Sequence, residues 1–444
     1  MKTRLPQLAL LCILACSSPA ISQSPPRPLT AQDSAAVAWI RTNAIPVQTL
    51  NTGSGFTDLA PLKAILQDAR IVGLGESTHG TSEFQRAKHR LFEFLVKEMG
   101  YTAFTLEGAY SDAQPLNDYI LHGTGSRADV LSKVGYTVWD TEEFAAMVDW
   151  MRAYNRTVPE ARKIRFFGVD LYRNSVGRSK VRAAVRRVLP TAVATTDSLF
   201  RALAEQERRF PWWDTTVVAG ARPGLDTLAS QLELRRQAAP GRLTQAEWDE
   251  VLKLLDVMRR GASAYSNRDR HMAENLMYLV DHEPPGTKFV FWQHNNHVSV
   301  DSGAAGYFLR QRYGDAYYAL ALYFNQGAYQ SRLFPPPGDY RWGDFKITNK
   351  PPAAPGSLEW FLARAELPHF FLDLRAASRT PAIDAWLRTS HDTYDGTWAF
   401  QDPSRRNFAI KVRERYDGLL FVNESTPTHP TPHARKTVER RESF

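Results

Sequence analysis

The feature that most constrains this chain is a strand, a glycine-rich turn, a helix and a second strand in direct succession. Arg70 to Leu74 is short and apolar, and Gly75 to Thr81 forms the turn. Ser82 to Met99 has helical periodicity and stops at Gly100, which suits a left-handed helix end. Tyr101 to Leu106 is again short, apolar and β-rich. This order predicts a βαβ unit, which implies two parallel strands.

Later segments repeat the theme. Strands are expected at Ile164–Val169, Lys288–Trp292, Ala316–Leu322, His369–Leu374 and Gly418–Val422, and helices at Asp33–Ile40, Leu59–Leu66 and Thr141–Asn155. We therefore predict an α/β fold with a mainly parallel sheet flanked by helices. Residues 33–178 and 281–427 form its two parts, 179–280 form a large helical insertion or lid over the cleft, and 428–444 form a flexible tail.

The first 22 residues have the pattern of a secretory signal peptide. Lys2 and Arg4 precede an apolar run from Leu8 to Ala15, and small residues follow up to Ser22. An alternative is a lipid anchor on Cys16, because Ile13 to Cys16 loosely resembles a lipoprotein box. The sequence thus predicts an exported protein, periplasmic or secreted. Both cysteines lie in this leader, which excludes a catalytic cysteine from a chain cleaved near Ser22.

The remaining composition excludes two classes of partner. No later stretch approaches the roughly 18 to 20 continuous apolar residues that a membrane-spanning helix needs. The formal net charge of +8 falls to about +4 on the body once the leader and the basic tail are set aside, and the charges are mixed along the chain. We therefore expect neither a membrane span nor a nucleic-acid partner. The oligomeric state is not predicted.

Acidic residues and imidazoles follow four separate predicted strands. In open α/β sheets, ligands bind at the carboxyl ends of the strands. One such residue can be an accident of helix capping, but four strand ends favour a site. The residues that collect there are Glu76, His79, Glu107, Asp170, His294 and His297.

The turn and the helix after it give the strongest local signal. Glycines flank Glu76 and His79, which permits a tight turn and close approach of the backbone. Lys88 falls on the same helical stripe as Phe84, where a lysine is costly unless it is paired. It either extends its stem to water or pairs with a carboxylate. Arg268, next to Asp269, is either part of an ordinary helical ion pair or a binding residue.

Two mechanisms fit these residues. An imidazole held by a carboxylate can deprotonate a water that attacks an ester carbonyl, with another imidazole or the lysine stabilising the oxyanion. Alternatively, the acids and imidazoles bind a divalent metal that activates the water. A serine nucleophile is disfavoured, because His79 stands where the second glycine of a nucleophile elbow belongs.

At this point the motifs resemble the erythromycin esterase family. Their order and spacing hold from about residue 33 to residue 427. The motifs are Val72 to Gly80, Lys88 to Phe92, Leu106 to Gly108, Trp139 with Phe144, Trp150 to Asn155, Arg268 and Asp269 with Met272, and His294 to Val298.

The resemblance implies a carboxylic ester hydrolase that opens the lactone ring of erythromycin-like macrolides, and so inactivates the antibiotic, by direct attack of water with no covalent enzyme intermediate. No cofactor is expected. It implies a fold with helical cover over a deep cleft. It assigns His79 as general base with Glu76 and Glu107 as carboxylate partners, and places His294 and His297 at the far wall. Substrate-binding roles are expected for Lys88, Asp170 and Arg268. Gln293 departs from the smaller residue common in relatives, which leaves the substrate open.

Two alternatives remain from the sequence. The same cleft could belong to a non-catalytic exported protein that binds haem or a metal, or to a metal-dependent hydrolase of another substrate. The expected partner is a small-molecule ester or lactone substrate.

Overall fold

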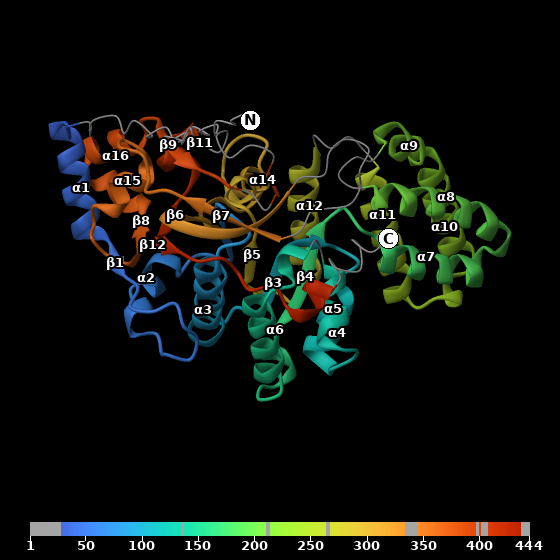
Figure 1. The fold of residues 1–444 in the computed structure, drawn as a ribbon. Helices are drawn as coiled ribbons and strands as arrows, with labels where there is room; N and C mark the ends of the chain where they lie inside the picture. Colours follow the sequence, from blue (N-terminus) through green and yellow to red (C-terminus); the bar gives the residue numbers. More distant parts are fainter. Residues whose placement is uncertain are drawn as a thin grey trace, which may run out of the picture.

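The computed structural model describes residues 28–134, 137–209, 214–262, 267–333, 345–396, 399–400 and 407–436 of the 444-residue chain. The expected signal peptide, residues 1–22, lies outside the described residues. The described chain forms one large, mostly parallel sheet between helices, so the predicted α/β fold is confirmed (Figure 1).

The sheet places the strands of the predicted βαβ unit near its centre. Strands β12, β6, β2, β5, β3 and β4 run parallel, while β8 runs antiparallel to both of its neighbours, β12 and β1. β2 and β3 do not pair with each other, because β5 lies between them. The order is β1 (Ile45–Pro46), β8 (His369–Asp373), β12 (Gly418–Ser425), β6 (Tyr317–Leu333), β2 (Ile71–Leu74), β5 (Phe289–Trp292), β3 (Ala103–Ala109) and β4 (Arg165–Asp170).

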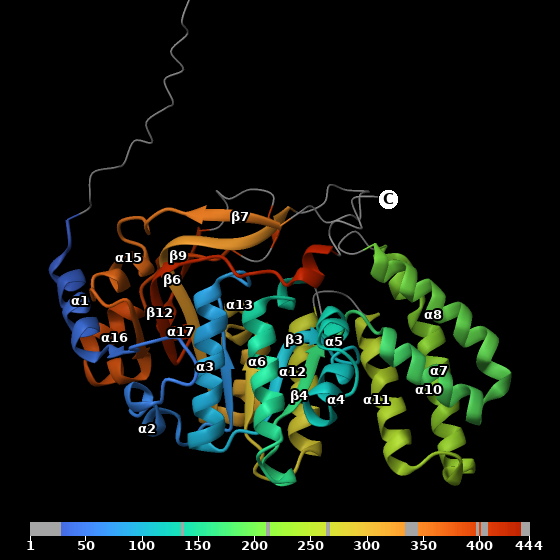
Figure 2. The ribbon, with the colours of Figure 1, turned by 60° about the horizontal axis from the view of Figure 1, so that its bottom comes forward.

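Two sets of helices cover the two faces of the sheet (Figure 2). The first set is α2 (Leu62–Leu66), α3 (Ser82–Met99), α4 (Gln114–His122), α5 (Arg127–Val134) and α6 (Glu142–Asn155). The second set is α1 (Ala31–Asn43), α12 (Arg268–His282), α14 (Ala305–Tyr313), α15 (Leu358–Ala363) and α16 (Pro381–Leu387).

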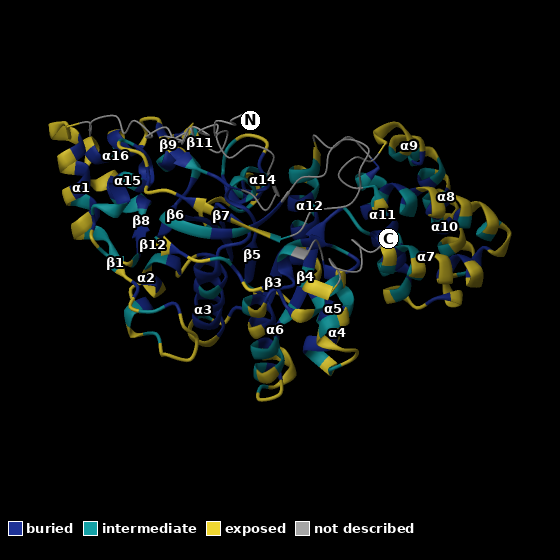
Figure 3. Cartoon of the chain, viewed as in Figure 1, coloured by how far each residue is buried: buried dark blue, intermediate teal, exposed yellow. Residues whose placement is uncertain are grey.

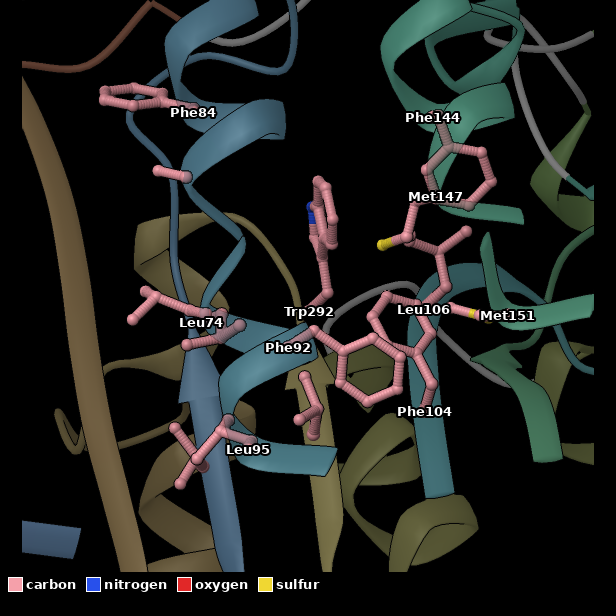
Figure 4. Packing of buried hydrophobic residues seen from close by; sticks show 14 of the residues in the cluster. Leu74, Phe84, Phe92, Leu95, Phe104, Leu106, Phe144, Met147, Met151 and Trp292 are labelled. Carbon is pink, nitrogen blue, oxygen red and sulfur yellow. The ribbon is translucent and has the colours of Figure 1, made fainter. Parts of the chain in front are cut away.

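Strand β5 shows why both faces are apolar. Val290 and Trp292 point to the core on one face, while Phe289 and Phe291 point to the core on the other. Side chains alternate along a strand, so a strand buried on both sides needs a continuous apolar run. Trp292 packs between α3 and α6, with its ring 5.8 Å from that of Phe104 (Figure 4).

Helix α3 begins and ends as the sequence predicts. It runs from Ser82 to Met99 and stops at Gly100, which has a φ of 75°. A side chain rarely adopts this left-handed conformation, which explains the glycine. The expected helix at Thr141–Asn155 is also present as α6, where the hydroxyl of Thr141 accepts a hydrogen bond from the backbone N–H of Phe144.

The predicted large helical segment is present and has its own core. It contains α7 (Ser175–Val188), α8 (Val193–Arg208), α9 (Thr215–Gly220), α10 (Arg222–Ala238) and α11 (Gln245–Gly261). These helices lie beyond the β4 end of the sheet (Figure 1), and yellow on their outer faces marks exposed residues (Figure 3). The expected range 179–280 also took in α12, which instead packs against the sheet through Met272 and Leu276. A role as a lid stays a prediction.

Three expectations about the second half of the sheet need correction. The strand expected at Ala316–Leu322 continues to Leu333 and pairs with a strand that was not predicted, β7 (Phe345–Lys350). The short strands β9 (His391–Tyr394), β10 (Ala399–Phe400) and β11 (Asn407–Ile410) were also missed. They are too short or too polar to show a clear apolar alternation.

The segment from Thr426 to Ala434, here called the strap, corrects the expected flexible tail. Glu83 accepts hydrogen bonds from the backbone N–H and the hydroxyl of Thr426, and Thr428 N–H donates to the Gly80 carbonyl. Thr431 donates to Asp140 at 2.5 Å. The strap therefore binds the N-terminal ends of α3 and α6, and its prolines and threonines serve this extended path. Residues 437–444 lie outside the described part.

No helix within the described residues is long and apolar enough to cross a membrane.

Candidate active site

The turn after β2 is built around close backbone contacts. A Cβ atom at Gly80 would lie 1.9 Å from the carbonyl oxygen of Gln330, so only glycine fits there. At Gly75 a Cβ would lie 2.3 Å from the side-chain oxygen of Asn295. The glycines thus let the turn pack directly against β6 and the start of α13 (Asn295–Val298). This packing fixes where Glu76 and His79 project.

Glu76 lies at the centre of this turn and is fully buried. One carboxylate oxygen is 2.6 Å from Nδ1 of His79, and the other accepts from Nζ of Lys88 at 2.7 Å and from the indole N–H of Trp292 at 3.2 Å. Burial acts to raise the pKa of Glu76, but Lys88 and His79 outweigh it and hold the pKa below its ordinary value. Glu76 is therefore an ionised carboxylate with three donors.

Lys88 is also fully buried, and it lies on the apolar stripe of α3, as the sequence indicated. Its ammonium donates to Glu76 and lies 4.3 Å from the ring centroid of Trp292. Burial lowers its pKa to about 8, against the attraction of Glu76 and Glu107. The prediction that a carboxylate pairs with Lys88 is confirmed for Glu76.

A second charged cluster joins the ends of β3 and β4 to the first turn of α12. Arg268 donates to Glu107 at 2.9 Å and to both oxygens of Asp170, at 3.1 and 2.7 Å. Nε2 of His297 lies 3.3 Å from Glu107, and its Nδ1 lies 2.5 Å from Asp269. Arg268 and Asp269 thus connect separate strand ends, rather than forming the ordinary helical pair considered from the sequence.

The charges in this cluster stabilise one another. Burial acts to lower the pKa of His297, but Glu107 and Asp269 raise it to about 10. Burial acts to raise the pKa of Glu107, but His297 and Arg268 hold it well below its ordinary value. At neutral pH the cluster therefore contains a protonated imidazole at His297 and an ionised carboxylate at Glu107.

His294 lies between the two clusters. Its ring centroid is 5.2 Å from that of His79 and 6.4 Å from that of His297. Its backbone N–H donates to Glu107 at 3.1 Å. Nε2 lies 2.9 Å from Oδ1 of Asp395, an ion pair whose angles are not those of a hydrogen bond. Burial acts to lower the pKa of His294, but Asp395 raises it above its ordinary value.

The eight residues that the sequence singled out are thereby brought together where the carboxyl ends of β2, β5, β3 and β4 meet, here called the sheet edge. Two tryptophans complete this region: Trp139, whose ring lies 5.3 Å from that of His79, and Trp292. The sequence reasoning missed Asp395, because its only local signals are its position after the weak strand β9 and before Gly396, and an Asp-Gly pair is typical of an ordinary turn.

The three imidazoles differ in what their nitrogens contact. In His294, Nδ1 accepts from Asn296 N–H at 3.5 Å and Nε2 faces Asp395. In His297, Nδ1 faces Asp269, and Nε2 faces both Glu107 and Nη1 of Arg268. His79 uses Nδ1 for Glu76, and its Nε2 has no partner among the described residues. Of these three rings, His79 is the one with a nitrogen open to a ligand.

The described residues contain no group of three or more His, Cys, Asp or Glu side chains arranged to hold a metal ion. The acids and imidazoles of the site instead face lysine, arginine and one another.

Comparison with known proteins assigns the family. Residues 96–425, about three quarters of the chain, match the erythromycin esterase family. The chain belongs to this family. This membership confirms the family that the motifs predicted, and it identifies the protein as a hydrolase with the α/β fold of that family.

Individual relatives are more distant. YbfO of Bacillus subtilis, named for a proposed hydrolase activity, is 22% identical over 430 residues, or 88% of this chain and 91% of its own. Erythromycin esterase type II of Escherichia coli is 32% identical over 136 residues, which are 31% of this chain and 32% of its own.

Solved structures confirm the fold over most of the chain. A Bacillus cereus protein has a TM-score of 0.76 at 23% identity and covers 91% of this chain and 100% of its own. An erythromycin esterase mutant in its open conformation has a TM-score of 0.63 at 18% identity, over 86% of this chain and 98% of its own. At these identities the likeness concerns the fold alone.

Proposed function

We propose that this protein hydrolyses an ester or lactone bond by attack of a water that His79 deprotonates. One observation carries the proposal: Nδ1 of His79 is held by the buried carboxylate of Glu76, while Nε2 has no partner among the described residues. A carboxylate on one ring nitrogen fixes the tautomer and leaves the other nitrogen as a base.

The proton transfers follow from this arrangement. Nε2 of His79 takes a proton from water as the water oxygen bonds to the carbonyl carbon, which gives a tetrahedral intermediate. Glu76 then faces an imidazolium, and its negative charge stabilises that charge. When the intermediate breaks down, the C–O bond of the ester breaks and His79 returns the proton to the leaving alcohol oxygen. No bond to the protein forms.

Lys88 has a supporting part in this scheme. Its ammonium contacts Glu76 at 2.7 Å on the oxygen that does not face His79. A proton on Glu76 would remove the acceptor that orients His79, and Lys88 keeps this carboxyl ionised. We propose that the substrate binds beside the second charged cluster. The residues proposed to line this side of the site are Arg268, Asp170, Glu107, His294 and His297.

The proposed substrate class is an erythromycin-like macrolide. The support is membership of the family and the match to the Escherichia coli erythromycin esterases. Incubation of the purified protein with erythromycin is expected to produce a species heavier by one water. A panel of other macrolides and simple esters, run in parallel, identifies the preferred bond. If no member of the panel gains water, the hydrolase proposal fails and a binding function takes its place.

We propose that the attacking water is activated without a metal. Preincubation with a chelator, followed by its removal, should leave the rate unchanged. A rate that falls on chelation and returns on addition of a divalent cation would instead support the metal-dependent alternative.

We also propose that the protein acts outside the cytoplasm, on the strength of the basic and apolar pattern in residues 1–22. Mass spectrometry of the mature N-terminus after expression tests this, since cleavage near Ser22 and a lipidated Cys16 give different masses.

A further inference from the structure

Asp395 is a buried acid that stands between the two turns that carry the imidazoles. It follows β9 directly and is 7% exposed. Oδ1 lies 2.9 Å from Nε2 of His294, and Oδ2 accepts from the side-chain amide of Asn296 at 3.1 Å. The next residue, Gly396, donates its N–H to the Ser77 carbonyl at 2.7 Å. One short segment therefore touches both turns.

This segment is itself held in place. The backbone N–H of Tyr394 donates to the buried carboxylate of Glu359 at 2.7 Å, and the Tyr394 hydroxyl lies 2.8 Å from that of Tyr329. Asp395 thus has a hydrogen-bonded residue on either side. A carboxylate that is fixed so firmly against an imidazole determines which way that imidazole faces.

The contact decides which nitrogen of His294 carries a proton. Nδ1 of His294 accepts a hydrogen bond from the Asn296 N–H, so the proton of a neutral ring is on Nε2, and the Asp395 carboxylate oxygen 2.9 Å from Nε2 favours a proton there. Nε2 therefore holds a proton, whether the ring is neutral or positively charged. A nitrogen in this state cannot accept a proton from water.

We propose that Asp395 is a positioning residue that removes His294 as a competing base and presents its ring to His79. The two rings lie edge to face, with centroids 5.2 Å apart and an interplanar angle of 63°. Asp395 thereby leaves Nε2 of His79 as the one basic imidazole nitrogen of the three rings and fixes the wall beside it. This inference rests on the proposed function of His79.

A double-mutant cycle tests whether Asp395 acts through His294. Asp395→Ala should lower kcat at least about tenfold with KM nearly unchanged, because the ring beside His79 loses its orientation. In a His294→Phe background the same change should have little further effect. Asp395→Asn should recover much of kcat, because its amide oxygen can still lie against the protonated Nε2 and keep the ring in place. Asp392→Ala, an exposed acid in the same segment, is the matched control.

Equal losses for Asp395→Ala with and without His294, or an Asn variant as poor as the Ala variant, would overturn the proposal. Either result would mean that Asp395 supports the fold or acts elsewhere.

A second measurement needs no turnover and so separates this inference from the proposed function. NMR of protein labelled with ¹⁵N at the histidine rings reports the protonation of each nitrogen. The His294 signal, assigned by its loss in His294→Phe, should show a proton on Nε2 in the wild type and an altered ring state in Asp395→Ala. An unchanged signal contradicts the inference. A changed signal in a protein that hydrolyses nothing keeps the contact but rejects the catalytic role of His79.

Discussion

The sheet edge and the helical segment use charged residues in opposite ways. At the sheet edge, the side chains of Glu76 and Lys88 have 0% exposure and contact each other at 2.7 Å. In the helical segment, Lys180 and Glu250 form a pair of almost the same length, 2.6 Å, with side chains 41% and 39% exposed. The two ion pairs look alike by distance and differ in their surroundings.

The difference teaches that burial, and not distance, identifies the costly pair. Removing charges from water costs several kcal/mol per ion, and a surface pair contributes only about 0 to 1 kcal/mol. At the sheet edge the chain keeps a fully buried lysine against a fully buried carboxylate and bears this cost, which the exposed pair of Lys180 and Glu250 avoids. Such an expense is typical of a functional site.

The largest expected effect is on activity at the sheet edge. His79→Ala should lower kcat on the order of a thousandfold or more, because no other imidazole nitrogen replaces Nε2. His282→Ala, an exposed histidine on α12, is the control and should leave the rate unchanged. Steady-state kinetics on the substrate found in the panel gives both values. A His79→Ala enzyme with near wild-type kcat would assign the base elsewhere.

The next effect is on stability and tests the comparison directly. Lys88→Met leaves Glu76 buried with its charge uncompensated, and should lower the free energy of unfolding by about 3 to 5 kcal/mol. Denaturant unfolding followed by circular dichroism measures it. If Lys88→Met unfolds at the wild-type denaturant concentration, the buried pair is no more important than a surface one.

A smaller effect depends on pH. The pKa of His297 is raised to about 10 from an ordinary value of 6.5, so its protonated form stabilises the fold. This contribution is complete below about pH 6.5 and is lost as the pH rises toward 10. His297→Gln should therefore destabilise the protein by on the order of a few kcal/mol at pH 6 and by much less at pH 10. Unfolding curves of both proteins at the two pH values test this, and a constant difference would contradict it.

The smallest effect sharpens the other side of the comparison. Lys180→Met removes an exposed partner of Glu250 and should change the free energy of unfolding by less than about 0.5 kcal/mol. It is the matched control for Lys88→Met, because the substitution is chemically the same. A loss above about 1 kcal/mol would show that the helical segment also depends on its ion pairs.

The sequence predicted the parts of the fold that have strong local signals. Helix α3 was placed at its observed bounds because an apolar stripe and Gly100 define it. Strands β2 and β5 were recognised as short, fully buried apolar runs. The antiparallel direction of β8 and the pairing of β6 with β7 are tertiary features that no local pattern encodes.

The candidate site shows the same division. Glu76, His79 and Lys88 could be found because a tight turn and an amphipathic helix make their residue types unusual. Asp395 could not, since its importance comes from a contact with His294 across the fold. The same holds for the strap, whose threonines and prolines read as a flexible tail until their partners on α3 and α6 are known.

Because the strap lies near the C-terminus, the site is completed late in the synthesis of the chain. During synthesis, every candidate residue leaves the ribosome before Thr428, whose N–H holds the Gly80 carbonyl beside His79. A product of stalled translation that ends before the strap therefore carries all these side chains but lacks the segment that secures their turn. We therefore expect a chain to become active only after synthesis has passed the strap. A fusion partner attached directly after Pro427, in place of the rest of the strap, should reduce the activity.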